Sequence, residues 1–289
     1  MIIVKLIGGL GNQMFQYAAA RSLSLRHGTE LKLDLFFLEG EQVGNTPRKF
    51  ELDNFCITAE KASRWEVSSM SGRGSSRLAT TCARLFQRAA GYTDYREKFF
   101  HFDPRVSTLP DNVYLEGYWQ SERYFADIGD IIRKEFMVTP PLTGRNLELA
   151  CEIQSVNSVS LHVRRGDYVT EEKTHGVCDI EYYRKAEERV AQELGNPEFF
   201  VFSDDPEWVA SNLKLRHPAR YIRNNGGMPH EDLRLMSLCR HNIIANSSFS
   251  WWGAWLNDNP GKSVFAPREW FRDKRYNTAD ILPESWIKL

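Results

Sequence analysis

One pattern occurs three times in the second half of the chain: a short apolar run, a polar cluster, and then a segment with helical spacing. The apolar runs are residues 159–163, 198–202 and 242–245. Because these runs are short and alternate with helical segments, they predict the strands of a parallel sheet in an α/β fold. Open sheets of this kind bind ligands at the carboxyl ends of their strands, so the polar clusters are the predicted site.

The N-terminal segment predicts a second sheet of the same kind. An apolar run at residues 2–7 is followed by a glycine-rich turn at residues 8–11, and Asn12 can cap a helix that ends at Gly28. Residues 31–35 form the next apolar run. We therefore expect two Rossmann-like domains with parallel sheets that face each other across a cleft.

The boundary between these domains is expected near the proline-rich segment at residues 139–144. We set the N-terminal domain at residues 1–150 and the C-terminal domain at residues 151–289. Within the N-terminal domain, the serine- and glycine-rich residues 68–76 predict a loop, and residues 77–90 predict a basic helix.

Composition restricts the class of partner. The 289 residues carry a formal net charge of −1, so no overall field favours nucleic acid, and any anion site is local. The five cysteines are widely spaced and form no C-x-x-C pair, which fits a reducing compartment and argues against a disulfide framework or a structural zinc site. The apolar N-terminal run is too short for a signal peptide or a membrane span. We expect a cytoplasmic protein.

The first polar cluster contains two adjacent arginines, Arg164 and Arg165, just after His162. Guanidinium groups bind phosphate oxygens in a bidentate manner, so the pair predicts a clamp for a phosphate-bearing ligand. The alternative is a surface ion pair of either arginine with Asp167 or a nearby glutamate.

The middle cluster is acidic: Ser203, Asp204 and Asp205 follow the run at residues 198–202. The carboxylates could bind a divalent ion, accept hydrogen bonds from the edge of a guanine base, or cap the helix that Pro206 opens. Between the two ligand roles we favour guanine, because the arginines already neutralise the phosphates.

The third cluster, Asn246, Ser247 and Ser248, precedes a predicted helix. Its hydroxyl, amide and backbone N–H groups could bind an anion at the helix N-terminus, or simply cap the helix.

The turn at residues 8–13 resembles a dinucleotide-binding fingerprint, but the G-x-G-x-x-G pattern that starts at Gly9 has Met14 in place of its last glycine. Asn12 and Gln13 are better suited to hydrogen-bond a sugar or a phosphate across the cleft.

Three segments together resemble the α-1,2-fucosyltransferases of glycosyltransferase family 11, in particular the bacterial ones: residues 8–18, 162–168 and 246–252. Residues 115–121 and 175–178 are similar as well. The segments keep their order and span most of the chain, so their combination is specific.

The resemblance implies a GT-B fold and inverting transfer of L-fucose from GDP-β-L-fucose to the 2-hydroxyl of a terminal galactose, with no obligatory metal and no other cofactor. It implies that Arg164 or Arg165 holds the β-phosphate, that His162 and one of the two aspartates approach the guanine, and that the two serines serve the phosphates. The acceptor would be a galactose-terminated glycan, with a lipid-linked glycan as one option.

Arg164, Arg165 and Asp167 are the predicted catalytic group. The arginines would stabilise the charge on the departing GDP, and Asp167 would hold an arginine or accept a proton. The identity of the base stays open, and the departing phosphate can also take the proton. The candidate bases are Glu116, Asp167, Glu171, Glu172 and His175.

Two alternative functions stay open: a GT-B transferase that uses another nucleotide sugar, and a carbohydrate-binding protein without catalysis. The arginines disfavour the second, since a neutral glycan does not need them. For the helix at residues 77–90 we favour packing over a core, and keep weak contact with an anionic membrane face as the alternative. The sequence shows no N-terminal anchor like that of the animal members, which fits a bacterial cytoplasmic enzyme, either free or peripheral at the inner membrane face.

Overall fold

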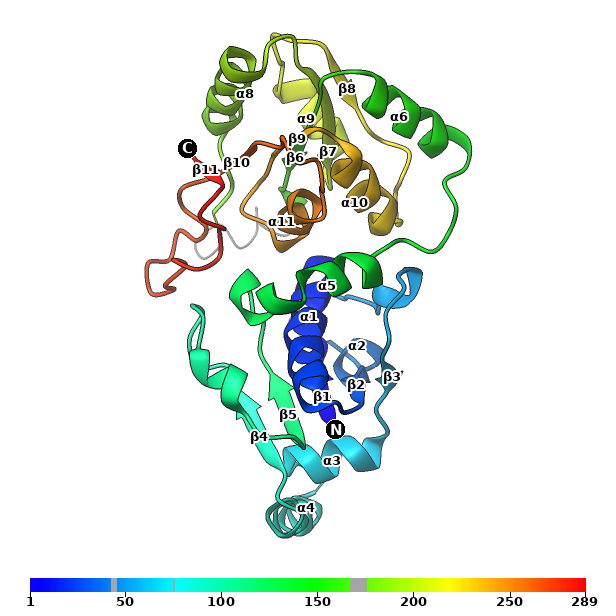
Figure 1. Ribbon diagram of the computed structural model, residues 1–289, viewed down its shortest axis with the longest axis vertical. Coiled ribbons are helices and arrows are strands. Elements are labelled where there is room, and N and C mark those ends of the chain that lie inside the picture. The colour runs from blue at the N-terminus through cyan, green and yellow to red at the C-terminus, as the bar shows by residue number, and fades with distance from the viewer. Residues whose placement is uncertain (43–45, 75, 167–175) are drawn as a thin grey trace. The chain divides into compact units, whose positions relative to one another are not determined.

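The computed structural model describes residues 1–42, 46–74, 76–166 and 176–289 (Figure 1). It divides into two compact units. Unit 1 comprises Met1–Met137 with Ala279–Ile281, and unit 2 comprises Val138–Thr278 with Leu282–Leu289.

The division falls between residues 137 and 138 rather than at residue 150. The helix α6 (Gly144–Ser155), which a boundary at residue 150 would cut, packs against α10 (Pro229–Leu238). Leu149 and Ile153 of α6 share a buried apolar cluster with Leu235 of α10, so the whole helix belongs to unit 2.

Unit 1 contains a five-stranded sheet of order β3-β2-β1-β5-β4, in which every neighbouring pair is parallel. Its strands are β1 (Ile2–Lys5), β2 (Leu31–Asp34), β3 (Glu60–Lys61), β4 (Thr93–Arg96) and β5 (Val113–Glu116). Its helices are α1 (Leu10–His27), α2 (Phe36–Glu39), α3 (Arg64–Ser71), α4 (Arg77–Ala89) and α5 (Gly129–Glu135). Short 3₁₀ turns lie at Leu52–Asn54, Pro104–Thr108, Glu122–Tyr124 and Ala126–Ile128.

The predicted strand–turn–helix–strand opening of unit 1 is confirmed. The helix α1 ends at Gly28, whose left-handed backbone (φ 61°) lets its N–H cap the last turn. The helix begins after Gly9, however, so Asn12 lies inside the first turn instead of capping it.

The loop predicted at residues 68–76 is helical up to Ser71, because α3 begins earlier than the composition suggests. Ser63 and Glu66 form a capping box, in which each side chain accepts a hydrogen bond from the other residue's backbone N–H. Gly72 then ends the helix in the left-handed conformation.

Unit 2 contains a six-stranded sheet of order β11-β10-β9-β6-β7-β8, again with every neighbouring pair parallel. Its strands are β6 (Ser158–Val163), β7 (Glu198–Ser203), β8 (Ala219–Tyr221), β9 (His241–Ile243), β10 (Val264–Ala266) and β11 (Ile287–Lys288). Besides α6 and α10, its helices are α8 (Ile180–Leu194), α9 (Pro206–Asn212) and α11 (Ser248–Trp255).

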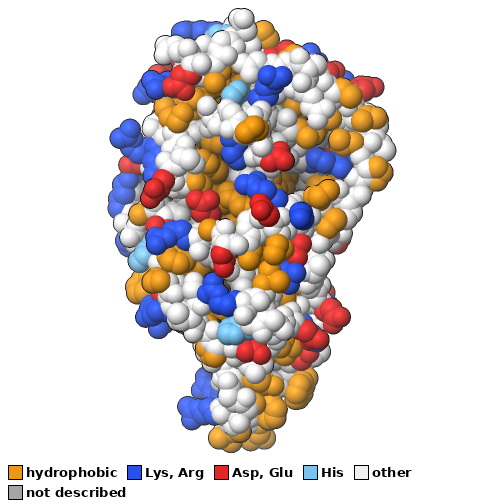
Figure 2. All heavy atoms as spheres, viewed as in Figure 1, with side chains coloured by type: hydrophobic (Ala, Val, Ile, Leu, Met, Phe, Trp, Pro, Cys, Tyr) orange, Lys and Arg blue, Asp and Glu red, His pale blue; other side chains and the backbone are white. Residues whose placement is uncertain are grey.

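Surface charges are mixed in sign: Figure 2 shows lysine and arginine side chains interspersed with aspartate and glutamate. This distribution agrees with the near-zero net charge. Within the described residues, no helix combines the length and the apolar character that crossing a bilayer requires.

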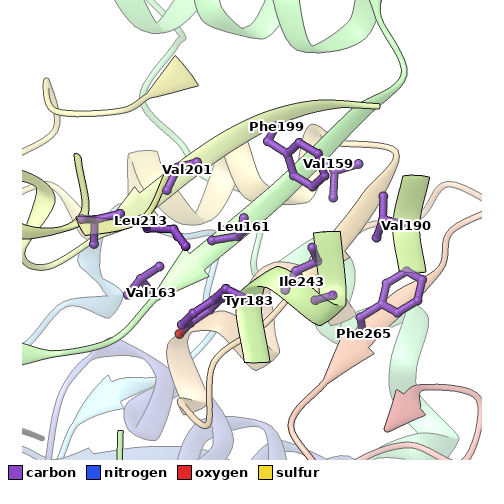
Figure 3. Packing of buried hydrophobic residues seen from close by; sticks show 12 residues of the cluster. Val159, Leu161, Val163, Tyr183, Val190, Phe199, Val201, Leu213, Ile243 and Phe265 are labelled. Atoms are coloured by element: carbon purple, nitrogen blue, oxygen red, sulfur yellow. The ribbon is translucent and has the colours of Figure 1, made fainter. Parts of the chain in front are cut away.

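The central strand β6 is buried on both faces. Leu161 and Val163 point into a core that also contains Tyr183 of α8 and Val201 of β7 (Figure 3). Side chains alternate along a strand, so His162 points to the opposite face. On that face His162 is buried and its ring lies against that of Phe249 of α11.

Candidate functional site

The three polar clusters come together at one edge of the unit 2 sheet. Strand β6 pairs with β7 on one side and with β9 on the other, all in parallel register. The residues that follow these strands therefore meet at their carboxyl ends, as predicted from the repeated pattern.

Asp204 fixes the turn that carries the arginines. Its Oδ2 lies 3.0 Å from Nη1 of Arg164, and its Oδ1 accepts a hydrogen bond of 2.9 Å from the backbone N–H of Arg165. A Cβ at Gly166 would overlap Oδ2 of Asp204, so the glycine permits this close approach. One carboxylate thus holds both the backbone and a side chain of the arginine pair.

Arg165 is held from α9. Its guanidinium carbon lies 3.4 Å from the centroid of the Trp208 ring, and its Nε is 3.6 Å from Oδ2 of Asp205. Asp205 also caps α9 by accepting a hydrogen bond from the N–H of Trp208. The sequence analysis did not identify Trp208. The available signal was its position in the first turn of the helix that follows the acidic end of β7.

His162 is neutral in this environment. Its side chain is buried, its ring centroid lies 5.4 Å from that of Phe249, and burial, assisted by the charge of Arg164, lowers its pKa to about 3. Among the described residues, neither its Nδ1 nor the buried Nε of Arg165 has a hydrogen-bond partner. Buried polar atoms are normally satisfied, so an unsatisfied nitrogen on His162 and another on Arg165, just after the same strand, are consistent with a ligand at this edge of the sheet.

The acidic cluster interacts mainly with the arginines. Capping is confirmed for Asp205. Arg164 pairs with Asp204 and Arg165 with Asp205, which differ from the ion-pair partners suggested by the sequence, a glutamate or Asp167, the latter outside the described residues. Ser203 accepts a hydrogen bond from the N–H of Asp205. Hydrogen bonding of an aspartate to guanine stays a prediction. Among the described residues there is no group of three histidine, cysteine or acidic side chains that could hold a metal ion.

In the third cluster, Asn246 has a structural role. Its amide donates to the carbonyls of Gly176 and Trp270, and its oxygen accepts from the thiol of Cys178. Ser247 occupies the N-cap of α11 but makes no side-chain capping bond, and Ser248 begins the helix. The two serines and the helix N-terminus are therefore the better candidates for an anion.

Asn12 and Gln13 lie in unit 1, and Gln13 is fully engaged there. Its amide donates to the carbonyls of Gly8 and Lys49, and its oxygen accepts from the N–H of Glu51. Asn12, which is less buried, accepts a hydrogen bond from Gln120. Gln13 thus shapes the glycine-rich turn, and the expectation that it binds a ligand conflicts with its complete set of internal bonds.

Among the candidate bases, only Glu116 lies in the described residues. Burial alone would raise its pKa, but hydrogen bonds from Lys5 and Arg73 outweigh burial and lower it. Such a carboxylate is a weak proton acceptor. The remaining candidates lie outside the described residues: Asp167, Glu171, Glu172 and His175.

Glu97 is a carboxylate that sequence reasoning missed. It follows β4 and accepts hydrogen bonds from the backbone N–H groups of Tyr118 and Trp119, while burial raises its pKa to about 7. Trp119 is fully buried and has a φ of 56°. Glu97 therefore anchors a strained turn at the carboxyl end of β5.

The chain is similar in sequence to known glycosyltransferases. A profile of glycosyl transferase family 11 matches residues 86–289. An alpha-1,2-colitosyltransferase of Escherichia coli is 33% identical over 100% of this chain and 99% of its own length. The galactoside 2-alpha-L-fucosyltransferase Sec1 of Mus musculus is 25% identical over 99% of this chain and 73% of its own length.

The fold is shared with a solved fucosyltransferase. An Arabidopsis thaliana FUT1 variant in complex with GDP superposes with a TM-score of 0.52 at 12% identity, over 99% of this chain and 75% of that one. This chain consists of two α/β units that each contain a parallel sheet, and together with this likeness that architecture confirms the GT-B class. The chain belongs to glycosyl transferase family 11, and it is a glycosyltransferase.

Proposed function

We propose that the enzyme transfers L-fucose from GDP-β-L-fucose to the 2-hydroxyl of a terminal galactose, with inversion and without an obligatory metal. The observation that carries this proposal is the arginine pair after β6, with Arg164 held by Asp204 and Arg165 held by Trp208. Two fixed guanidinium groups at the carboxyl edge of a parallel sheet fit a diphosphate.

The proposed reaction is a direct displacement. The bond between the anomeric carbon and the β-phosphate oxygen breaks while the galactose oxygen bonds to the opposite face of that carbon. GDP leaves with additional negative charge, which Arg164 and Arg165 stabilise from positions that are set before the reaction. The galactose 2-hydroxyl loses its proton when its oxygen bonds to the anomeric carbon, and this proton passes to a base or to the departing phosphate.

The remaining site residues are proposed to bind the nucleotide. The neutral imidazole of His162, buried beside the arginines, is suited to hydrogen-bond the guanosine part. Ser247, Ser248 and the N-terminal N–H groups of α11 are suited to the phosphates.

A second donor deserves comparison because a relative that matches the whole chain is named a colitosyltransferase. Colitose is L-fucose without the 3-hydroxyl group. The mouse relative named a galactoside fucosyltransferase, and the motif resemblance described above, favour L-fucose. A site that hydrogen-bonds a hydroxyl strongly rejects a substrate that lacks it, so the two donors should differ clearly in rate.

The nucleotide and the donor can be tested separately. We expect GDP to raise the melting temperature while UDP and ADP do not. We also expect product formation from GDP-fucose and a lactose-type acceptor, with the α-1,2 linkage read by NMR, and faster than from GDP-colitose. Preference for UDP would indicate another nucleotide sugar, and galactoside binding without turnover would indicate a carbohydrate-binding protein. Either result would overturn the proposal.

We place the enzyme in a bacterial cytoplasm, where a reducing environment keeps thiols free. The support is the set of five unpaired cysteines, three of which are exposed.

A further inference from the structure

The helix α4 packs against unit 1 through small and polar side chains and leaves its large apolar side chains in solvent. Ala83 is its buried residue, and Ala79 is half-buried. Leu78 and Leu85, in contrast, are 77% and 63% exposed. A surface helix normally turns its apolar face to the core, so the orientation of α4 is the reverse of the expected one.

The exposed apolar side chains form one patch. Phe86 of α4 is 44% exposed and contacts Trp65 of α3 edge to face, with ring centroids 5.8 Å apart. Trp65 is itself 65% exposed. We call Trp65, Leu78, Leu85 and Phe86 the α4 patch. Clusters of exposed apolar side chains mark interaction sites more often than scattered ones do.

A row of positive charge borders the α4 patch. Arg77, Arg84 and Arg88 are exposed, and at 100° per residue they fall within about 40° of one another around the helix, next to Leu78 and Leu85. The helix contains no acidic residue, and none of the three arginines forms an ion pair within the described part of the chain. At the lower end of Figure 2, where Figure 1 places α4, hydrophobic side chains lie beside a group of lysine and arginine side chains.

We propose that the α4 patch docks on the surface of a bilayer that contains anionic lipid. An apolar stripe flanked by arginines is the pattern of helices that lie in the membrane interface, where tryptophan is also enriched. The aliphatic stems of the arginines can rest on the acyl boundary while their guanidinium groups reach the lipid phosphates. This proposal reverses the packing interpretation favoured from the sequence, and it is independent of the proposed donor and acceptor.

The positive charge beside the α4 patch also disfavours a dimer in which a second copy of the chain covers this patch. A two-fold symmetric contact through the α4 patch would bring the arginine rows of two copies close together, with no acid on either helix to neutralise them. Anionic lipid headgroups supply the missing charge, with each arginine strengthening binding about fivefold.

The test is co-sedimentation of the full-length protein with vesicles of phosphatidylcholine alone or mixed with phosphatidylglycerol. We expect binding only to the mixed vesicles, and weaker binding at higher salt. The double variants Leu78→Ser/Leu85→Ser and Arg84→Gln/Arg88→Gln should lose binding, the second by roughly 25-fold from two arginines. Matched controls in unit 2 are Leu147→Ser, at a side chain 49% exposed, and Arg184→Gln/Lys185→Gln on α8.

Each outcome decides the proposal. Loss of binding in both α4 variants but in neither control, with unchanged melting temperatures, supports it. Equal binding to phosphatidylcholine vesicles, or no binding to either composition, overturns it. A dimer in analytical ultracentrifugation that Leu78→Ser/Leu85→Ser abolishes, without vesicle binding, also overturns it and assigns the α4 patch to self-association. Transfer to a soluble acceptor reports on the proposed function separately, since α4 lies outside the strand-end site.

Discussion

The guanidinium of Arg165 stacks 3.4 Å from the centroid of the Trp208 ring, and Trp208 is itself fixed by the capping carboxylate of Asp205. Stacking occupies one face of the guanidinium and leaves the N–H groups at its edge for partners in its plane. The helix α9 therefore orients an arginine that is attached to a different strand. This makes Trp208 a positioning residue for the proposed phosphate site.

Replacing Trp208 tests this coupling. A cation–π contact contributes about 0.5–2 kcal/mol, so we expect Trp208→Ala to lower kcat/KM for transfer about 2- to 30-fold, and Trp208→Phe to lower it less. A double-mutant cycle with Arg165→Ala separates positioning from general stability, because the two losses should overlap. Additive losses, or an equal loss in Trp65→Ala on unit 1, would contradict the positioning role.

Arg165 itself is expected to matter far more for activity than for folding. In the proposed mechanism Arg165→Ala removes a donor to the departing phosphate, and losses of that kind lower kcat about 10²- to 10³-fold. The melting temperature should change little, since the side chain lies at a strand end. Arg165→Lys should recover part of the rate, and Arg216→Ala, at an exposed arginine of unit 2, should keep it. Near-normal transfer by Arg165→Ala would exclude the clamp.

Gly166 should be intolerant of a methyl group. A Cβ there overlaps Oδ2 of Asp204, so Gly166→Ala must move the carboxylate that holds Arg164 and the N–H of Arg165. We expect weaker GDP binding in isothermal titration, with the fold retained. Gly226→Ala is the matched control, because a Cβ at that position meets nothing within 4 Å. Equal GDP affinity for both variants would show that Asp204 does not set the clamp.

The sequence predicted where the site lies better than how its residues interact. Short apolar runs with polar ends predicted β6, β7 and β9, because the spacing of apolar residues and the polar residues that end each run are local features of the sequence. The contact of Arg165 with Trp208 and the double role of Asp204 depend on how two strand ends meet, which no local pattern encodes. No local pattern predicts the role of Gln13 either, because its amide forms hydrogen bonds with backbone groups that include the distant N–H of Glu51.

The α3 and α4 segments illustrate a different limit. Serine and glycine between residues 68 and 76 suggested a loop, yet the capping box of Ser63 and Glu66 starts a helix there. The amphipathic pattern of α4 was visible, but a pattern alone does not say which face packs. In the structure the small residues Ala79 and Ala83 pack against unit 1, and Leu78 and Leu85 are exposed to solvent.

Transfer should persist after treatment with EDTA. In the proposed mechanism, Arg164 and Arg165 supply the positive charge that a divalent ion provides in other enzymes, and Asp204 is already engaged by Arg164 and by the N–H of Arg165. The measurement is the initial rate of the purified enzyme with EDTA and then with added Mg²⁺. Complete loss that Mg²⁺ restores would return the aspartates to metal binding.

Glu97 should make the stability of the fold depend on pH. Burial raises its pKa from 4.5 to about 7, so between these values the folded state binds a proton that the unfolded state lacks. Stability should therefore fall as pH rises from about 4.5 to 7, and change little from this group outside that window. His162, whose pKa is lowered, acts in the opposite direction, so the total profile mixes the two effects.

Comparison of variants isolates the contribution of Glu97. Glu97→Gln cannot titrate, and its amide can accept from only one of the N–H groups of Tyr118 and Trp119. We expect it to be less stable than the wild type in urea unfolding at pH 5, with a smaller difference at pH 8, where the wild-type carboxylate carries its unfavourable buried charge. The exposed Glu41→Gln serves as the control. A stability difference that stays constant across this range would mean that Glu97 is ionised throughout, and that its two hydrogen bonds outweigh its burial.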